Sequence, residues 1–118
     1  MIVTDEGFTT DDPSLNWVEV SADAPLPTTW PQAIRIRFDS FADGRGFTLA
    51  RKLRARGFRG RLRASGHLIA DQYAMARRSG FDEVEITLEM ASRQPEDQWR
   101  ARADWQSHDY QARLGGRT

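Results

Sequence analysis

The chain has 118 residues, 39% of them hydrophobic and 29% charged, and this composition is ordinary for one globular domain. It contains no cysteine, which excludes disulfides, thiolate nucleophiles and cysteine-bound iron–sulfur clusters. No apolar run approaches the roughly 18 residues that a membrane-spanning helix needs.

The net charge of zero conceals a strong segregation of charge along the chain. Residues 1–34 carry six acidic and no basic side chains, residues 35–63 carry ten basic and two acidic ones, and residues 64–118 carry nine acidic and seven basic ones. The middle segment, with a net charge of +8, indicates either a surface for a partner or a surface that is neutralised within the fold. Of the two, we prefer neutralisation within the fold.

The first 33 residues predict an arm rather than a folded layer. They contain four prolines, and only WVEV at residues 17–20 has the pattern of a strand. The opening MIVTDEGFTTDD is acidic and lacks the basic segment of a secretory signal, so we expect a cytoplasmic protein. We expect residues 1–33 to form an N-terminal arm packed on a single α/β domain of residues 34–118.

Three segments have the alternating pattern of strands. In IRIRF at residues 34–38 and RLRAS at residues 61–65, apolar and basic side chains alternate. FDEVEITL at residues 81–88 has Val84, Ile86 and Leu88 on one face and polar side chains on the other.

Two helices are predicted between these strands. Residues 49–56 predict a basic helix that is capped by Thr48 and ended by Gly57. Residues 68–79 predict a second helix that ends at Gly80.

Residues 95–113 predict a last helix, which carries Trp99, Trp105 and Tyr110. We interpret these aromatic residues as core or dimer packing rather than as a platform for stacking bases. Because of them, and because of the one-sided sheet, we expect a homodimer.

The alternation of strands and helices predicts an α/β fold with a small parallel βαβαβ sheet. Since the strands alternate rather than being apolar throughout, one sheet face packs under the helices and the other is charged. Strand order 1-2-3 places both helices on one face, and we prefer it to the alternative order 2-1-3. The charged face must be solvated, salt-bridged internally, covered by the arm or used by a partner.

Ligands of parallel α/β units bind beyond the carboxyl ends of the strands, where two loops of this chain are expected to meet. We expect this edge to bring Asp43, Arg45, His67 and Asp71 together, with Gln72 following. Gly44 and Gly46 would let backbone N–H groups point into the turn before a helix, and Arg45 would offer a fork for a phosphate, sulfite or carboxylate. His67 and Asp71 are the catalytic candidates, since Asp71 could orient the imidazole.

The alternative interpretation of these residues is structural. The glycines would only make the turn, Asp43 would cap it, and Arg45 would pair with Asp43 or with the acidic arm. His67 would be a capping or buried-network residue.

The charged sheet face supplies a candidate partner surface of four arginines: Arg35, Arg37, Arg61 and Arg63. The basic residues lie on two strands and a helix and face different directions, and no DNA-binding motif is present, so nucleic acid is not the expected partner. We expect no metal site, because two histidines are too few, and no cofactor, because no flavin or nicotinamide motif is present.

The segment FADGRGFTLARKLRARGFRGRLRASGHLIADQYAMARRSGFDEVEI at residues 41–86 resembles a bacterial family with the pattern F-x-DGRGxSxAxxLRxxGxxGxLRAxGxxxxDQ…RxGFD. WQSHDYQARL and MIVTDEGF extend the resemblance over nearly the whole chain. The family is uncharacterised, and its genes commonly lie beside those of assimilatory sulfite reductase. The signature falls on Phe41, Asp43, Gly44, Arg45, Gly46, Leu53, Arg54, Gly57, Gly60, Leu62, Arg63, Gly66, Asp71, Gln72, Arg77, Gly80, Phe81 and Asp82.

The resemblance implies an accessory protein of assimilatory sulfite reduction, which docks on sulfite reductase or another sulfur-assimilation protein and carries an oxyanion site at the DGRG loop. Members are described as probable oxidoreductases or accessory proteins. Many have Asp at the position of His67 and Cys at that of Ser79, so neither side chain is implied as a shared catalyst. The alternative is a small enzyme or ligand-binding domain that acts on a phosphate- or sulfur-oxyanion-containing molecule.

Overall fold

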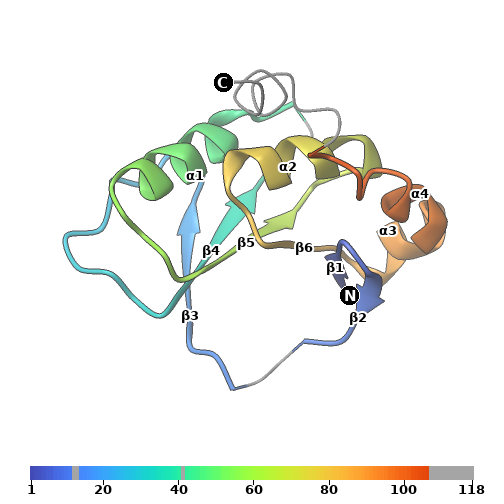
Figure 1. Cartoon of the computed structure of the whole chain (residues 1–118), viewed down its shortest axis with the longest axis horizontal. Helices are drawn as coiled ribbons and strands as arrows, with labels where there is room; N and C mark the ends of the chain where they lie inside the picture. Colours follow the sequence, from blue (N-terminus) through green and yellow to red (C-terminus); the bar gives the residue numbers. More distant parts are fainter. Residues whose placement is uncertain (12–13, 41, 107–118) are drawn as a thin grey trace.

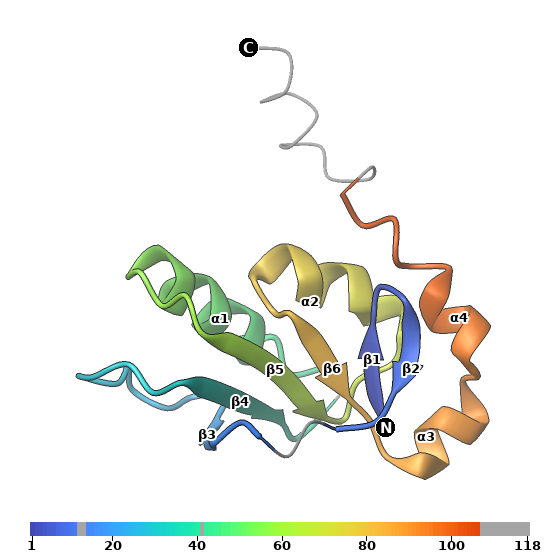
Figure 2. The same cartoon turned by 60° about the horizontal axis from the view of Figure 1, so that its bottom comes forward.

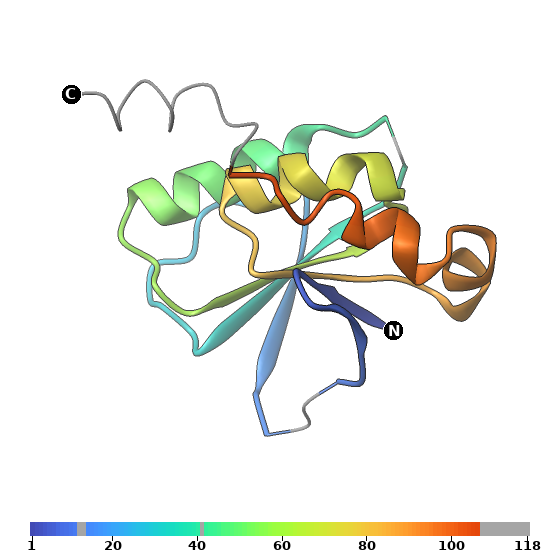
Figure 3. The same ribbon diagram turned by 45° about the vertical axis from the view of Figure 1, so that its right-hand side comes forward.

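A six-stranded sheet with two helices over one face forms the centre of the described residues, which are 1–11, 14–40 and 42–106 of a computed structural model (Figures 1 and 3). The strands are β1 (Ile2–Thr4), β2 (Gly7–Thr9), β3 (Trp17–Ser21), β4 (Ala33–Phe38), β5 (Arg61–Gly66) and β6 (Glu83–Glu85). The helices are α1 (Arg45–Ala55), the short 3₁₀ helix η1 (Ala70–Gln72), α2 (Tyr73–Ser79), α3 (Leu88–Arg93) and α4 (Glu96–Arg100).

The strands lie in the order β2-β1-β6-β5-β4-β3. The predicted mixed α/β class is confirmed, and β3 to β6 run parallel. The strand order differs from the predicted 1-2-3 of a three-stranded sheet, because β3 extends the sheet beyond β4 and the hairpin of β1 and β2 extends it antiparallel to β6 (Figure 2). The three predicted strands, β4, β5 and β6, are neighbours in its middle.

The alternation of β4 and β5 gives the sheet one apolar and one charged face. Ile34 pairs in register with Leu62, and Ile36 with Ala64, and all four side chains are fully buried. They belong to one core cluster with the apolar residues of α1, so this is the face that the helices cover. Burial of each large apolar side chain stabilises the fold by about 1.5–3 kcal/mol.

Helix α1 begins four residues earlier than predicted, at Arg45. Thr48 is therefore an exposed residue inside the helix and not its N-cap, which is Gly44. The reason lies in the preceding turn, where the carboxylate of Asp43 accepts a hydrogen bond from the backbone N–H of Arg45. The predicted end at Gly57 is confirmed, with a φ of +99° and a bond from the backbone N–H of Phe58 to the carbonyl of Leu53.

The second predicted helix, residues 68–79, is divided into η1 and α2. The side chain of Gln72 accepts a hydrogen bond from the backbone N–H of Ile69 and closes the 3₁₀ turn before α2 begins. Gly80 ends α2 with a φ of +115°, as predicted.

The first nine residues form a hairpin that the sequence did not predict. Its turn carries Asp5, whose carboxylate accepts hydrogen bonds from the hydroxyl of Tyr73, the guanidinium of Arg77 and the indole N–H of Trp105. Partial burial opposes ionisation of Asp5, but these donors outweigh it and lower its pKa. The hairpin is thereby fixed to α2 and to the segment after α4.

The C-terminal part is less regular than predicted. The strand expected at 81–88 is limited to β6, because the Thr87 hydroxyl accepts from the backbone N–H of Met90 and starts α3. The helix expected at 95–113 is present only as α4, followed by turns to residue 106; its remainder, with Tyr110, lies outside the described residues. Trp99 is a core residue, as expected, and packs edge-on against Tyr73.

The two glycines of the DGRG turn should respond differently to alanine. Gly46 faces the ring of Phe38, which an added Cβ would overlap, so we expect Gly46→Ala to lower the free energy of unfolding by about 1–3 kcal/mol. Gly44→Ala is the control, because its Cβ would meet no atom within 4 Å and its φ of −84° suits alanine; we expect a change within about 0.5 kcal/mol. Urea denaturation measures both, and equal losses would contradict this packing role.

The lowered pKa of Asp5 gives a pH-dependent contribution to stability. We expect Asp5→Asn to lower the free energy of unfolding at neutral pH by about 1–3 kcal/mol, because three buried or half-buried donors lose a charged acceptor. In the native chain this contribution is fully present above the ordinary pKa of 3.8 and is lost as the pH falls through the lowered folded value. Urea titrations at a series of pH values should show that the free energies of unfolding of the native chain and of Asp5→Asn converge in acid. A difference that stays constant below pH 3.8 would contradict the assignment.

Candidate functional site

The DGRG turn lies between β4 and α1, at the carboxyl edge of the sheet. The carboxylate of Asp43 accepts hydrogen bonds from the backbone N–H of Arg45 at 3.1 Å and from its Nε and Nη2 at 3.0 Å. The hydrogen bonds from Arg45 lower the pKa of Asp43, and the same pairing raises the pKa of Arg45. The guanidinium fork that was expected to receive an oxyanion is therefore occupied by a carboxylate of its own turn.

The glycines of this turn do not build the expected backbone cradle. Gly44 has a φ of −84°, and Gly46 is already helical, so neither uses the left-handed region open to glycine. Position 46 requires glycine because a Cβ there would overlap the ring of Phe38. These contacts are the ones that the structural alternative expects, and anion binding at this turn stays a prediction.

His67 lies beside the end of β4, where its backbone N–H donates to the carbonyl of Phe38, but the predicted ligand residues line different hollows. Arg45 lines one hollow, His67 a second beside Thr87 and Arg93, and Asp71 a third. Asp71 accepts a hydrogen bond from Arg102 at 2.6 Å. Gln72 closes η1 by its bond to Ile69.

Several signature arginines hold the fold together. Arg54 donates to the carbonyls of Phe58, Gly60 and Gly80 and to the carboxylate of Asp82. Asp82 also accepts from the backbone N–H of Leu62, and Arg77 donates to the carbonyl of Phe81. These contacts close loops and helix ends, so they explain part of the signature without a ligand.

The proposed partner surface on the sheet is neutralised within the chain. Arg63 is 2% exposed, lies 4.0 Å from the ring centre of Trp17 and is bonded to Glu83, Glu85 and Asp11. Burial opposes the charge of Arg63, but its hydrogen bonds to Asp11 and Glu83 outweigh this and raise its pKa. The neighbouring pairs on this face are Arg61 with Glu83, Arg35 with Glu19 and Glu85, and Arg37 with Glu19 and Asp39.

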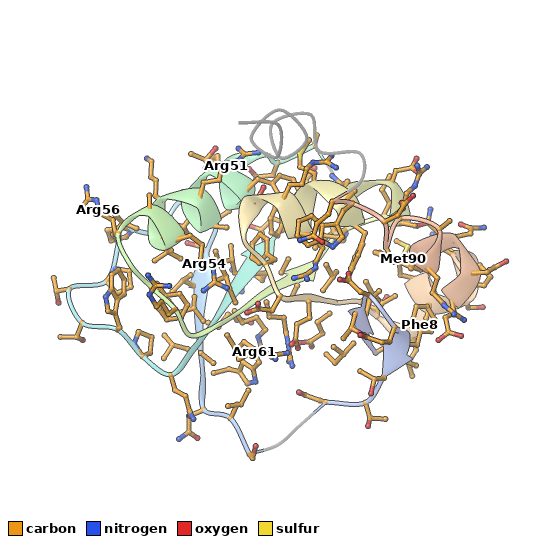
Figure 4. All side chains as sticks on the ribbon, in the orientation of Figure 1. Phe8, Arg51, Arg54, Arg56, Arg61 and Met90 are labelled. Atoms are coloured by element: carbon orange, nitrogen blue, oxygen red, sulfur yellow. The ribbon has the colours of Figure 1, made fainter. Side chains whose placement is uncertain are left out.

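The helix layer carries the opposite pattern. Five exposed basic side chains on or beside α1 and α2 form no ion pair within the described part of the chain. Figure 4 shows Arg51 and Arg56 directed away from the sheet, whereas Arg54 turns inward. We call this set the basic helix face; it consists of Arg51, Lys52, Arg56, Arg59 and Arg78.

A groove of about 470 Å³ runs along one side of α1. Its other wall is the segment that follows β3, a wall that the sequence did not reveal because the segment lacks any regular pattern. The groove is lined by Ala22, Asp23, Ala24, Pro25 and Leu26 and by Arg45, Thr48, Leu49, Lys52 and Arg56.

The described residues hold no cluster of three or more His, Cys, Asp or Glu side chains that could bind a metal ion. Over the same ranges, no helix has the length and apolar character needed to cross a membrane.

A model of the family described as "Bacterial protein of unknown function (DUF934)" matches residues 20–118. No curated protein matches the chain. No solved structure matches it either. The matched region contains the DGRG turn, the basic helix face and the groove, whereas β1, β2, Asp11 and Trp17 precede it.

Replacement of Arg63 should be far more costly than replacement of Arg37. We expect Arg63→Met to lower the free energy of unfolding by about 3–5 kcal/mol, because it removes the buried partner of Glu83, which is itself 2% exposed. Arg37→Met removes a half-exposed cation and should cost less than about 1 kcal/mol. Chemical denaturation compares the two. Similar losses would show that the sheet face is an ordinary solvated surface.

Proposed function

The chain belongs to this bacterial family, and we propose that it is an accessory protein of assimilatory sulfite reduction that docks an acidic partner on its basic helix face. The reductase is the partner that the resemblance implies. The observation that carries the docking role is that the five cations of this face have no ion-pair partner within the described chain, although the four sheet-face arginines all do.

The sorting of charge supports a surface for a partner. Two acidic side chains of the N-terminal segment, Asp11 and Glu19, pair with arginines of the sheet face and not with the basic helix face. An uncompensated cationic face on a chain of zero net charge attracts an acidic surface, accelerates encounter and disfavours basic partners.

The oxyanion interpretation has weaker support than docking. An oxyanion at the DGRG turn would compete with Asp43 for Arg45. The catalytic candidates His67 and Asp71 line different hollows. We therefore base the proposed function on the basic helix face rather than on this turn.

Charge reversal on and beside α1 should weaken the complex with the sulfite reductase whose gene we expect beside that of this chain. We expect the double variant Arg51→Glu, Arg56→Glu to reduce affinity by about ten-fold or more, because each reversal replaces attraction by repulsion. The affinity of the unaltered chain should also fall with added salt. Gel filtration and titration of the reductase measure both effects, and gel filtration of the chain alone tests the expected homodimer.

The matched control is Arg37→Glu with Arg93→Glu, which changes net charge equally at exposed positions away from the basic helix face. It should bind nearly as the native chain does. Equal weakening by both double variants would mean that net charge, and not this face, governs association. No complex with the native chain and no effect on the rate of sulfite reduction would overturn the proposed function.

A further inference from the structure

The groove beside α1 has an apolar floor. Ala22 and Leu49 are 5% and 7% exposed, and Leu26 packs half-buried against the core cluster. These side chains are aliphatic, and the lining, all of it within the described residues, contains no aromatic ring. The floor therefore suits an aliphatic or phenyl group, while a nucleic-acid base would find no ring on which to stack.

The rim of the groove is electrostatically polarised. At one end Arg45 lies between the carboxylates of Asp43 and Asp23, at 3.0 and 3.5 Å, so this end is compensated. At the other end Lys52 and Arg56 belong to the basic helix face and have no ion pair in the described chain. An occupant with an apolar group and negative charges beside it matches this arrangement.

The wall opposite α1 is held in place before anything binds. The backbone N–H of Ala24 donates to the carbonyl of Ser21, and the Ser21 hydroxyl donates to Asp23 at 2.8 Å. Pro25 and Pro27 restrict the backbone that follows. A preformed wall lowers the ordering cost of binding.

We infer that this groove receives one apolar side chain from an extended acidic segment of a partner protein, whose carboxylates lie along the basic helix face. The inference rests on the proposed docking function and names its recognition element. A segment fits better than a small anion, because Arg51, an exposed cation of the same helix with no ion pair in the described chain, lies outside the groove lining. The helix positions that line the groove are three or four residues apart, so they present one continuous edge to such a segment.

The test uses fluorescence anisotropy with the whole chain and two labelled peptides. Both consist of Asp and Glu around one central residue, which is Leu in the first and Ser in the second. We expect the leucine peptide to bind about ten-fold more tightly, because burial of one aliphatic side chain has roughly this effect. An oligothymidylate of equal charge should bind no better than the serine peptide.

Three variants locate the effect. Thr48→Phe fills the groove from an exposed helix position without changing charge and should abolish the preference for leucine. Lys52→Glu reverses a charge that lines the groove and should weaken binding of the leucine peptide more than binding of the serine peptide. Arg51→Glu reverses the adjacent charge outside the lining and should weaken both peptides equally. Thermal denaturation confirms that each variant is folded.

The outcomes separate this inference from the proposed function. Equal affinity for the two peptides, or a leucine preference that survives Thr48→Phe, overturns the groove assignment even if the reductase complex forms. Tighter binding of the oligothymidylate also overturns it and identifies the face as a nucleic-acid surface. Failure of the reductase complex alone, with the leucine preference intact, overturns the proposed reductase partner and leaves the groove assignment standing.

Discussion

The buried guanidinium of Arg63 is the constraint on which the arrangement of the charged residues depends. A cation withdrawn from water must be surrounded by carboxylates and hydrogen-bond acceptors, or the cost of its desolvation would exceed what a small domain can tolerate. Two of its partners, Glu83 and Glu85, come from the neighbouring strand, where Arg63 and Glu83 are paired in register. The third, Asp11, follows β2 in the chain and reaches the charged face of the sheet from there.

This single requirement also determines what is left for function. Asp11, Glu19 and the two glutamates of β6 are used on the sheet face, where they neutralise the arginines of β4 and β5. The exposed cations of the basic helix face receive none of them, whereas Arg45 and Arg77 of the helix layer pair with Asp23 and Asp5. In the described part of the chain, the segregated charge is therefore neutralised on one side of the sheet and forms a surface of unpaired cations on the other.

The parts of the fold that the sequence predicts are those with a repeating pattern or a decisive glycine. β4 and β5 alternate over five or six residues, and Gly57 and Gly80 end their helices with positive φ angles. β6 lies within the strand predicted at 81–88, whereas β1 and β2 contain three residues each, too few for a period to be distinguished from a loop, and they are strands because their neighbours pair with them. At the candidate site, the pairing of Asp43 with Arg45 was foreseen because it is local. The partner of the Asp71 carboxylate could not be predicted, since it is Arg102, which lies 31 residues away in the sequence.

The contacts of Asp5 have a consequence for how the molecule opens. One carboxylate joins the N-terminal hairpin, α2 and the segment after α4, and the α-amino group of Met1 adds a bond to the carbonyl of Ile86. The beginning of the chain and the residues up to 106 thus share their anchoring point and should open together, as one cooperative unit in amide hydrogen exchange. The hairpin and the residues after α4 would fray separately if each lay on the surface by itself. Joined at Asp5, they should have a common protection against exchange, and a proteolytic cut in either one should expose the other.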